Sequence, residues 1–128
     1  MDLKYAFSYM KVPLLTRREW GQYQILKEIC DQKNLIICPK VRLLDLVAPR
    51  PGFRNSRGLK ARVMSKHVDF VICTPDMNVV AIIELDDTTH LRPDRRKRDN
   101  FVDGVLFGAG YRVIHTWGIT SDILDFLE

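Results

Sequence analysis

Three acidic residues interrupt the most apolar segments of the chain, and their positions suit the binding of a cation. Asp69 lies in the run Val68–Cys73, and Glu84 and Asp86 lie near the end of the run Val79–Asp86. A carboxylate within an apolar strand is costly unless it is paired, hydrated or bound to a cation. Hard divalent ions prefer oxygen ligands. The three carboxylates therefore predict a site for a hard divalent ion.

The two apolar runs are expected to form a β-hairpin. Residues 74–78 between them include Thr, Pro, Asp and Asn, which are typical of turns. Side chains alternate between the two faces of a strand, so Glu84 and Asp86 share one face with Val80 and Ile82. The opposite face is wholly apolar: Val79, Ala81, Ile83 and Leu85. The carboxylates of this hairpin are therefore expected at adjacent strand ends.

A helix is expected to begin after Thr16, because the residues Thr16-Arg17-Arg18-Glu19 form a capping-box pattern. Apolar residues follow near helical spacing, and the helix should end between residues 31 and 34. Glu19 has two interpretations. Its carboxylate is either half of the cap or a further acid that faces the site built by the sheet.

An extended stretch is expected from Leu35 to Cys38 and from Val41 to Leu46, with Pro39 marking a sheet edge or a bulge. Lys40 and Arg42 are two residues apart and should share a face. They form either a solvated surface or a source of positive charge for a phosphate.

Two later segments are basic. Residues 48–65 read as a long loop with a short helix late in it, and they carry no acid but five cations: Arg50, Arg54, Arg57, Lys60 and Arg62. This loop either contacts a polyanion backbone or solubilises the protein. A second helix is expected from Pro93 to Gly108 or Gly110, and it opens with five cations between residues 92 and 98.

The remaining segments complete one α/β domain spanning residues 1–128. A strand is expected at residues 111–116 and a short helix at residues 121–127. Residues 1–14 are expected to form an arm or an edge strand. The order predicts a central mixed sheet of four to five strands flanked by helices.

With 46% hydrophobic and 28% charged residues, the composition does not fit a disordered chain. No apolar run approaches a bilayer span, and three scattered cysteines are interpreted as free thiols of a cytoplasmic protein.

Taken together, these segments resemble the restriction-endonuclease-like PD-(D/E)XK superfamily. Within it, the chain resembles an uncharacterised bacterial domain family related to the very-short-patch-repair endonucleases. The resemblance covers roughly residues 15–114. Its motifs are Lys40-Val41-Arg42, His67-Val68-Asp69-Phe70, Ile83-Glu84-Leu85-Asp86-Asp87, His90, Arg95 to Asp99, and Ala109-Gly110.

The resemblance implies a restriction-endonuclease-like core and a metal-dependent phosphodiesterase that acts on nucleic acid, with DNA favoured over RNA. Asp69 and Glu84 would hold Mg²⁺ or Mn²⁺, with Asp86 as a third acid and Glu19 assisting. The superfamily's usual lysine, two residues after the glutamate, is replaced here by Asp86. The candidates to substitute for it are His90, which we favour, and His67, Lys40 and Lys66; His90 also has a plain interpretation as a surface histidine.

Nucleic-acid contacts are predicted from the basic segments and the sheet edge. The residues are Arg42, Arg54, Arg57, Lys60, Arg62, Lys66, His67, Arg95 and Arg96. The net charge of +4 is by itself only a modest bias toward polyanions. Two other functions stay open from the sequence: a non-catalytic nucleic-acid-binding module on the same fold, or a partner-binding accessory domain of a larger protein.

Overall fold

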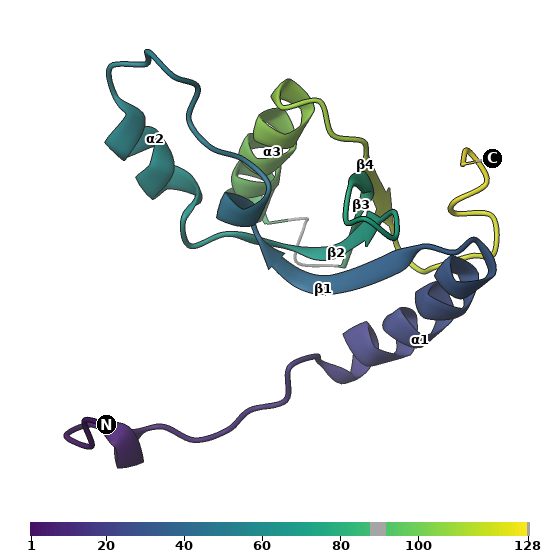
Figure 1. Cartoon of the computed structure of the whole chain (residues 1–128), viewed down its shortest axis with the longest axis horizontal. Coiled ribbons are helices and arrows are strands. Elements are labelled where there is room, and N and C mark those ends of the chain that lie inside the picture. Colours follow the sequence, from purple (N-terminus) through teal and green to yellow (C-terminus); the bar gives the residue numbers. More distant parts are fainter. Residues whose placement is uncertain (88–91, 128) are drawn as a thin grey trace.

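The sheet at the centre of the protein has four strands in the order β1-β2-β3-β4. The computed structural model describes residues 1–87 and 92–127 (Figure 1). The strands are β1 (Ile36–Arg42), β2 (His67–Cys73), β3 (Val79–Leu85) and β4 (Val113–Thr116), and the helices are α1 (Arg17–Gln32), α2 (Ser56–Val63) and α3 (Pro93–Gly108). Pairing is antiparallel from β1 to β3 and parallel between β3 and β4. The predicted α/β fold with a mixed sheet flanked by helices is confirmed.

The two faces of the sheet pack against different helices (Figure 1). On one face, Leu26 and Cys30 of α1 pack with Phe70, Ile83 and other sheet residues. A second apolar cluster joins the opposite face to α3 and includes Val68, Ile82, Val102 and Leu106. Burial of apolar side chains on both faces fixes α1 and α3 relative to the strand ends between them.

The N-terminus of α1 has the predicted capping box. Thr16 Oγ1 accepts a hydrogen bond from the Glu19 backbone N–H at 3.1 Å, and Glu19 Oε1 accepts one from the Thr16 N–H at 2.8 Å. These bonds satisfy two of the donors that a helix N-terminus leaves without partners. The helix ends at Gln32, inside the predicted range of residues 31–34.

Strand β1 is an edge strand, as the presence of Pro39 predicted, because a proline has no N–H to donate to a second neighbour. The expectation that the strand continues to Leu46 was wrong. The chain turns into a 3-10 helix at Leu43–Asp45. The Asp45 carboxylate accepts bonds from the backbone and the guanidinium of Arg42, and the side chain of Leu43 is fully buried. This local ion pair and the burial of Leu43 favour the turn over further strand.

The predicted hairpin of β2 and β3 is present, with Phe70 opposite Ile83. The pairing shifts between Ile72 and Cys73, near the turn. The strict alternation predicted for β3 therefore holds only toward its end: Val80 packs with the α1 cluster, although it was expected on the face of Glu84. At the other end of the hairpin, Glu84 keeps its place beside the start of β2.

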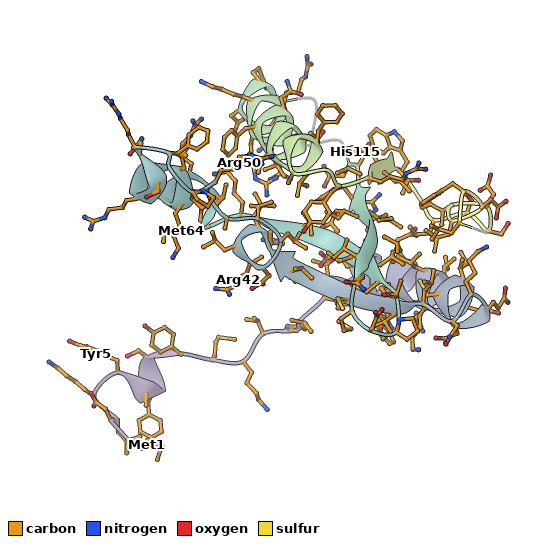
Figure 2. All side chains as sticks on the ribbon, turned by 45° about the horizontal axis from the view of Figure 1, so that its top comes forward. Met1, Tyr5, Arg42, Arg50, Met64 and His115 are labelled. Carbon is orange, nitrogen blue, oxygen red and sulfur yellow. The ribbon has the colours of Figure 1, made fainter. Side chains whose placement is uncertain are left out.

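The chain termini differ from one another in packing. Residues 1–14 lie away from the sheet, with Met1 and Tyr5 exposed (Figure 2), so they form an arm and the edge-strand alternative was wrong. The helix expected at residues 121–127 was also wrong, because this segment forms only turns, although the side chain of Leu124 is buried. Within the described residues, no helix combines the length and apolar character needed to cross a membrane.

Candidate functional site

A polar hollow of about 240 Å³ opens where β2 and β3 diverge, between the start of α1 and the start of α3. Five acidic residues line it: Glu19, Asp69, Glu84, Asp87 and Asp99. The positively charged and histidine side chains of its lining are Arg18, Arg95, Arg98 and His67. The sheet, α1 and α3 therefore bring together residues from four separate segments of the sequence.

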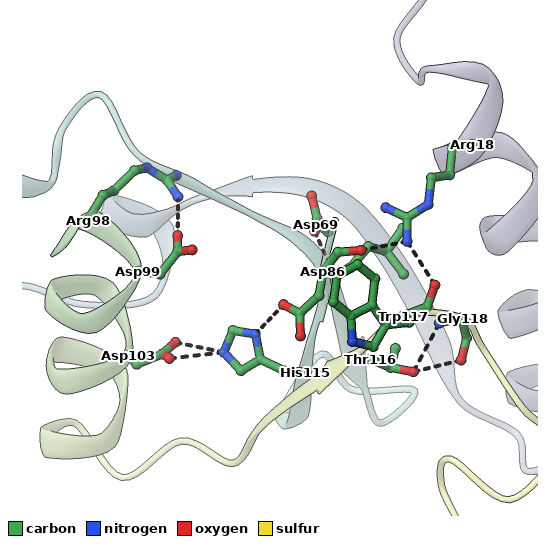
Figure 3. Close-up of polar contacts among 11 residues, drawn as sticks. Arg18, Asp69, Asp86, Arg98, Asp99, Asp103, His115, Thr116, Trp117 and Gly118 are labelled. Carbon is green, nitrogen blue, oxygen red and sulfur yellow. Dashed lines mark hydrogen bonds and ion pairs between the residues drawn. The ribbon is translucent and has the colours of Figure 1, made fainter. Parts of the chain in front are cut away.

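The floor of the hollow is formed by Asp69 and Glu84 on neighbouring strands. Regular pairing of β2 with β3 reaches Phe70 and Ile83. Beyond that pair, the backbone N–H of Leu85 donates to Asp69 Oδ2 at 2.7 Å (Figure 3). The Asp69 side chain thus takes the place of a backbone acceptor. Its carboxyl group also lies close enough to that of Glu84 for the two groups to influence each other's charge.

Glu84 is held in an environment that disfavours its charge. Burial, the neighbouring charge of Asp69 and the hydrogen bond between the two carboxyl groups raise the pKa of Glu84 to about 9, although the Arg98 guanidinium acts in the opposite direction. The Asp69–Glu84 pair consequently retains a proton at neutral pH. A divalent cation that replaced this proton would relieve the repulsion between the two carboxylates.

The donor set fits Mg²⁺ or Mn²⁺ in one respect, because Mg²⁺ is commonly bound by one or two carboxylates and retains several waters. The larger predicted set is not assembled. Among residues 1–87 and 92–127, no three His, Cys, Asp or Glu side chains are grouped so as to hold a metal ion. The fit therefore rests on Asp69 and Glu84 alone.

Glu19 has both of the roles that the sequence left open. It completes the cap of α1 and it lines the hollow. Its Oε1 also lies 3.8 Å from Lys40 Nζ, and the Lys40 backbone has a φ of +51°, which is uncommon for a residue with a side chain. Lys40 is therefore directed toward an acid of the hollow, whereas Arg42 forms an exposed ion pair with Asp45.

Asp86 takes part in a second polar cluster, on β4 and α3 (Figure 3). Its Oδ1 is 2.9 Å from His115 Nδ1, and the Nε2 of the same ring is 3.0 Å from both oxygens of Asp103. Burial lowers the pKa of His115, but the hydrogen bonds to Asp86 and Asp103 outweigh it and the pKa is raised overall. The side chain of Asp86 is thus held by His115 and is not part of the lining of the hollow.

Arg18 fastens the start of α1 to the ends of the strands. Its guanidinium donates to the backbone oxygen of Asp86 at 2.6 Å and to that of Trp117 at 2.8 Å (Figure 3). These two bonds span the end of β3 and the segment after β4. Arg18 therefore positions the wall of the hollow that α1 supplies.

The other predicted site residues are distributed over several surfaces. His67 and Arg95 line the hollow, and Arg96 is exposed on α3. Arg54, Arg57 and Lys60 are exposed in the loop before α2 and on α2 itself. Arg62 and Lys66 lie over the ring of Phe101. The prediction for His90 falls outside the described residues.

Sequence reasoning missed Arg18, Arg98, Asp103 and His115 as members of these clusters. One signal was available, because Asp99 and Asp103 are four residues apart and so lie on one side of a helix. His115 is likewise a polar residue in a short, mostly apolar strand. What the sequence did not contain was the parallel register that sets Glu84 beside His115.

Comparison with known proteins adds a family but no described activity. Neither the curated proteins nor the solved structures include a match to this chain. Residues 11–122 match the model of the family DUF2726, which is described as "Protein of unknown function". This match covers most of the chain and includes Asp69, Glu84, Asp86 and His115. The chain therefore belongs to the DUF2726 family.

Proposed function

We propose that this chain is a metal-dependent phosphodiesterase that acts on DNA, with Mg²⁺ or Mn²⁺ held by Asp69 and Glu84. The observation that carries the proposal is the pair of neighbouring carboxyl groups, Asp69 and Glu84, where β2 and β3 diverge, in a hollow that Arg95 and Arg98 also line. The resemblance of the sequence to the PD-(D/E)XK superfamily supports the same reaction.

Each part of the hollow has a chemical role in this proposal. A divalent ion, when bound, would lower the pKa of a water molecule coordinated to it and offset negative charge in the transition state. Arg95 and Arg98 come from one helix and provide guanidinium donors, which suit phosphate oxygens. Glu19 and Lys40 form an ion pair beside the hollow. In this proposal Lys40 takes the role of the superfamily's usual lysine, whose position is occupied here by Asp86.

DNA is proposed as the substrate because the basic residues extend beyond the hollow. Exposed cations continue along α2 and its preceding loop, at Arg54, Arg57 and Lys60. A polyanion backbone is recognised by such spread positive charge, whereas a small phosphate ester needs only the hollow.

We also propose a reducing compartment such as the cytoplasm, since Cys30, Cys38 and Cys73 are free thiols.

The metal site is tested by calorimetric titration of the protein with Mn²⁺. The variant Asp69→Asn/Glu84→Gln keeps the size of both side chains and an acceptor for the Leu85 N–H. We expect wild-type protein to bind Mn²⁺ and the double variant to lose this binding. Asp31→Asn, which removes an exposed carboxylate on α1, is the matched control and should bind as the wild type does. Unchanged Mn²⁺ affinity in the double variant would refute the assignment.

The reaction is tested separately with single-stranded, duplex and supercoiled DNA in Mg²⁺ or Mn²⁺. Cleavage by the wild type, lost in Glu84→Gln, is the expected result. A protein that binds Mn²⁺ through Asp69 and Glu84 but leaves every DNA form intact would contradict the proposed enzyme and retain the metal site.

One observation favours a second candidate, a non-catalytic nucleic-acid-binding module. Asp86 occupies the position of the superfamily's usual lysine, and its carboxylate is engaged by His115. This candidate predicts salt-sensitive DNA binding that persists in the Asp69→Asn/Glu84→Gln variant, without cleavage by the wild type.

A further inference from the structure

A second hollow, of about 320 Å³, lies between the end of α2 and the start of α3. It is lined by Arg62, Lys66, Asp94, Lys97, Arg98 and Phe101. Four of these six residues are cations and one is an acid. We call it the Phe101 hollow. Cations predominate in the Phe101 hollow, whereas acids predominate in the hollow at Asp69 and Glu84.

The cations of the Phe101 hollow are held in place by the aromatic ring. The Cζ atom of Arg62 lies 4.4 Å from the ring centroid of Phe101, and Lys66 Nζ lies 5.4 Å from it. Lys66 Nζ also donates a hydrogen bond to the backbone oxygen of Arg62 at 2.5 Å. Cation–π contacts of this kind orient the charged groups without neutralising them. The ring, which belongs to α3, thereby fixes Arg62 of α2 and Lys66, which follows α2 in the chain.

Crowding of like charges in one hollow is unfavourable until an anion binds there. Asp94 is the single carboxylate among the lining residues, and Asp99 pairs with Arg98 from outside the hollow, so the four cations retain a net positive charge. Guanidinium and ammonium groups at fixed positions match the oxygens of a phosphate. The Phe101 hollow therefore has the composition of a phosphate site that is already formed before the ligand arrives.

Arg98 connects the two hollows, because its side chain lines both of them. Its Nη1 donates to Asp99 Oδ1 at 3.1 Å, which holds the guanidinium at the boundary. We infer that the Phe101 hollow binds a phosphate of the same nucleic-acid strand, adjacent to the phosphate that lies at Asp69 and Glu84. This inference rests on the proposed function and narrows its substrate class.

The substrate class that follows is a polynucleotide strand with at least two successive phosphates. A nucleic-acid strand bound this way would run from the gap between α2 and α3 toward the place where β2 and β3 diverge; Figure 1 shows these elements. A nucleotide with a single phosphate would fill only one of the hollows. Longer oligonucleotides are therefore expected to bind more tightly than a mononucleotide.

The inference is tested by DNA binding to the full chain without metal, so that no cleavage takes place. The probe is a short fluorescent single-stranded oligonucleotide, and its affinity is measured at several salt concentrations in EDTA. The variant Arg62→Ala/Lys97→Ala removes two cations of the Phe101 hollow. The control Lys27→Ala/Lys33→Ala removes one cation within α1 and one at its C-cap, so both variants have the same net charge.

We expect the hollow variant to bind DNA about tenfold more weakly at low salt, and the slope of log affinity against log salt to become shallower by about 0.7 to 1.4. The control should differ little from the wild type. Equal affinities and slopes in the two variants would overturn the inference, as would the absence of DNA binding by the wild type. A specific loss of binding in the hollow variant, together with no cleavage by the metal-loaded wild type, would support the phosphate site and overturn the phosphodiesterase.

Discussion

Replacing Glu84 with glutamine is expected to stabilise the metal-free protein at neutral pH and to flatten the pH dependence of its stability. Burial and the neighbouring Asp69 raise the pKa of Glu84 from an ordinary value of 4.5 to about 9. Between these two pH values the folded protein binds a proton that the unfolded chain has released. The wild type therefore loses stability as pH rises through this range.

The size of the effect follows from the interval over which the proton is retained. From pH 4.5 to pH 7 the loss accumulates at about 1.4 kcal/mol per pH unit, which gives up to roughly 3.5 kcal/mol at pH 7. Glutamine does not titrate, and its amide N–H can donate to Asp69 as the protonated carboxyl group does. Glu84→Gln should thus exceed the wild type in stability by more at pH 8 than at pH 5.

The assay is urea unfolding of both proteins in EDTA at pH 5, 7 and 8. The raised pKa of His115 makes a contribution of the same sign, but this is common to both proteins and cancels in their difference. Asp31→Asn serves as a control for loss of an acidic residue at an exposed position. Adding Mn²⁺ should stabilise the wild type and leave Glu84→Gln with a smaller gain, since one carboxylate of the proposed site is absent.

Parallel stability curves for wild type and Glu84→Gln across pH 5 to 8 would refute this reasoning. They would mean that Glu84 is charged in the folded protein and that its carboxylate is already balanced by neighbouring cations. A variant less stable than the wild type at every pH would show instead that the amide fails to replace the hydrogen bond to Asp69.

Two further predictions concern the residues that surround the hollow. Arg18→Ala removes the charge-assisted bonds to the backbone oxygens of Asp86 and Trp117, and it should lower the free energy of unfolding by about 1–3 kcal/mol, as measured by urea denaturation. A value indistinguishable from that of the wild type would show that α1 is positioned by its apolar face alone. His115→Gln should reduce thermal stability more at pH 5.5 than at pH 8.5, because the stabilising contacts to Asp86 and Asp103 favour the imidazolium and are lost as pH rises through the raised pKa of His115. An equal loss at both pH values would indicate a neutral ring with a packing role.

Local sequence signals were sufficient for the elements whose ends are defined by short-range chemistry. The capping box at Thr16 and Glu19 located the start of α1, and Pro93 located the start of α3. Turn residues between the apolar runs located the β2–β3 hairpin. Each signal acts within a few residues, so it is written directly in the sequence.

The elements that sequence reasoning placed wrongly lack such signals. Residues 121–127 have helical spacing of apolar residues, but so short a segment gains little from helix formation, and burial of Leu124 is satisfied by turns. The extension of β1 to Leu46 failed because the Arg42–Asp45 ion pair and the burial of Leu43 favour a turn. In both cases tertiary packing outweighed a weak local preference.

The sequence by itself determined that Asp69 and Glu84 would meet, because a hairpin with period-two alternation places both carboxylates at adjacent strand ends. Only the tertiary structure decided what surrounds them. The parallel register of β3 and β4 places His115 opposite Glu84, from where its ring reaches the Asp86 carboxylate. The packing of α3 on the sheet brings Arg98 toward Glu84. These contacts join residues that are distant in sequence, and their geometry depends on how whole helices pack, for which no local pattern of residues is a sufficient guide.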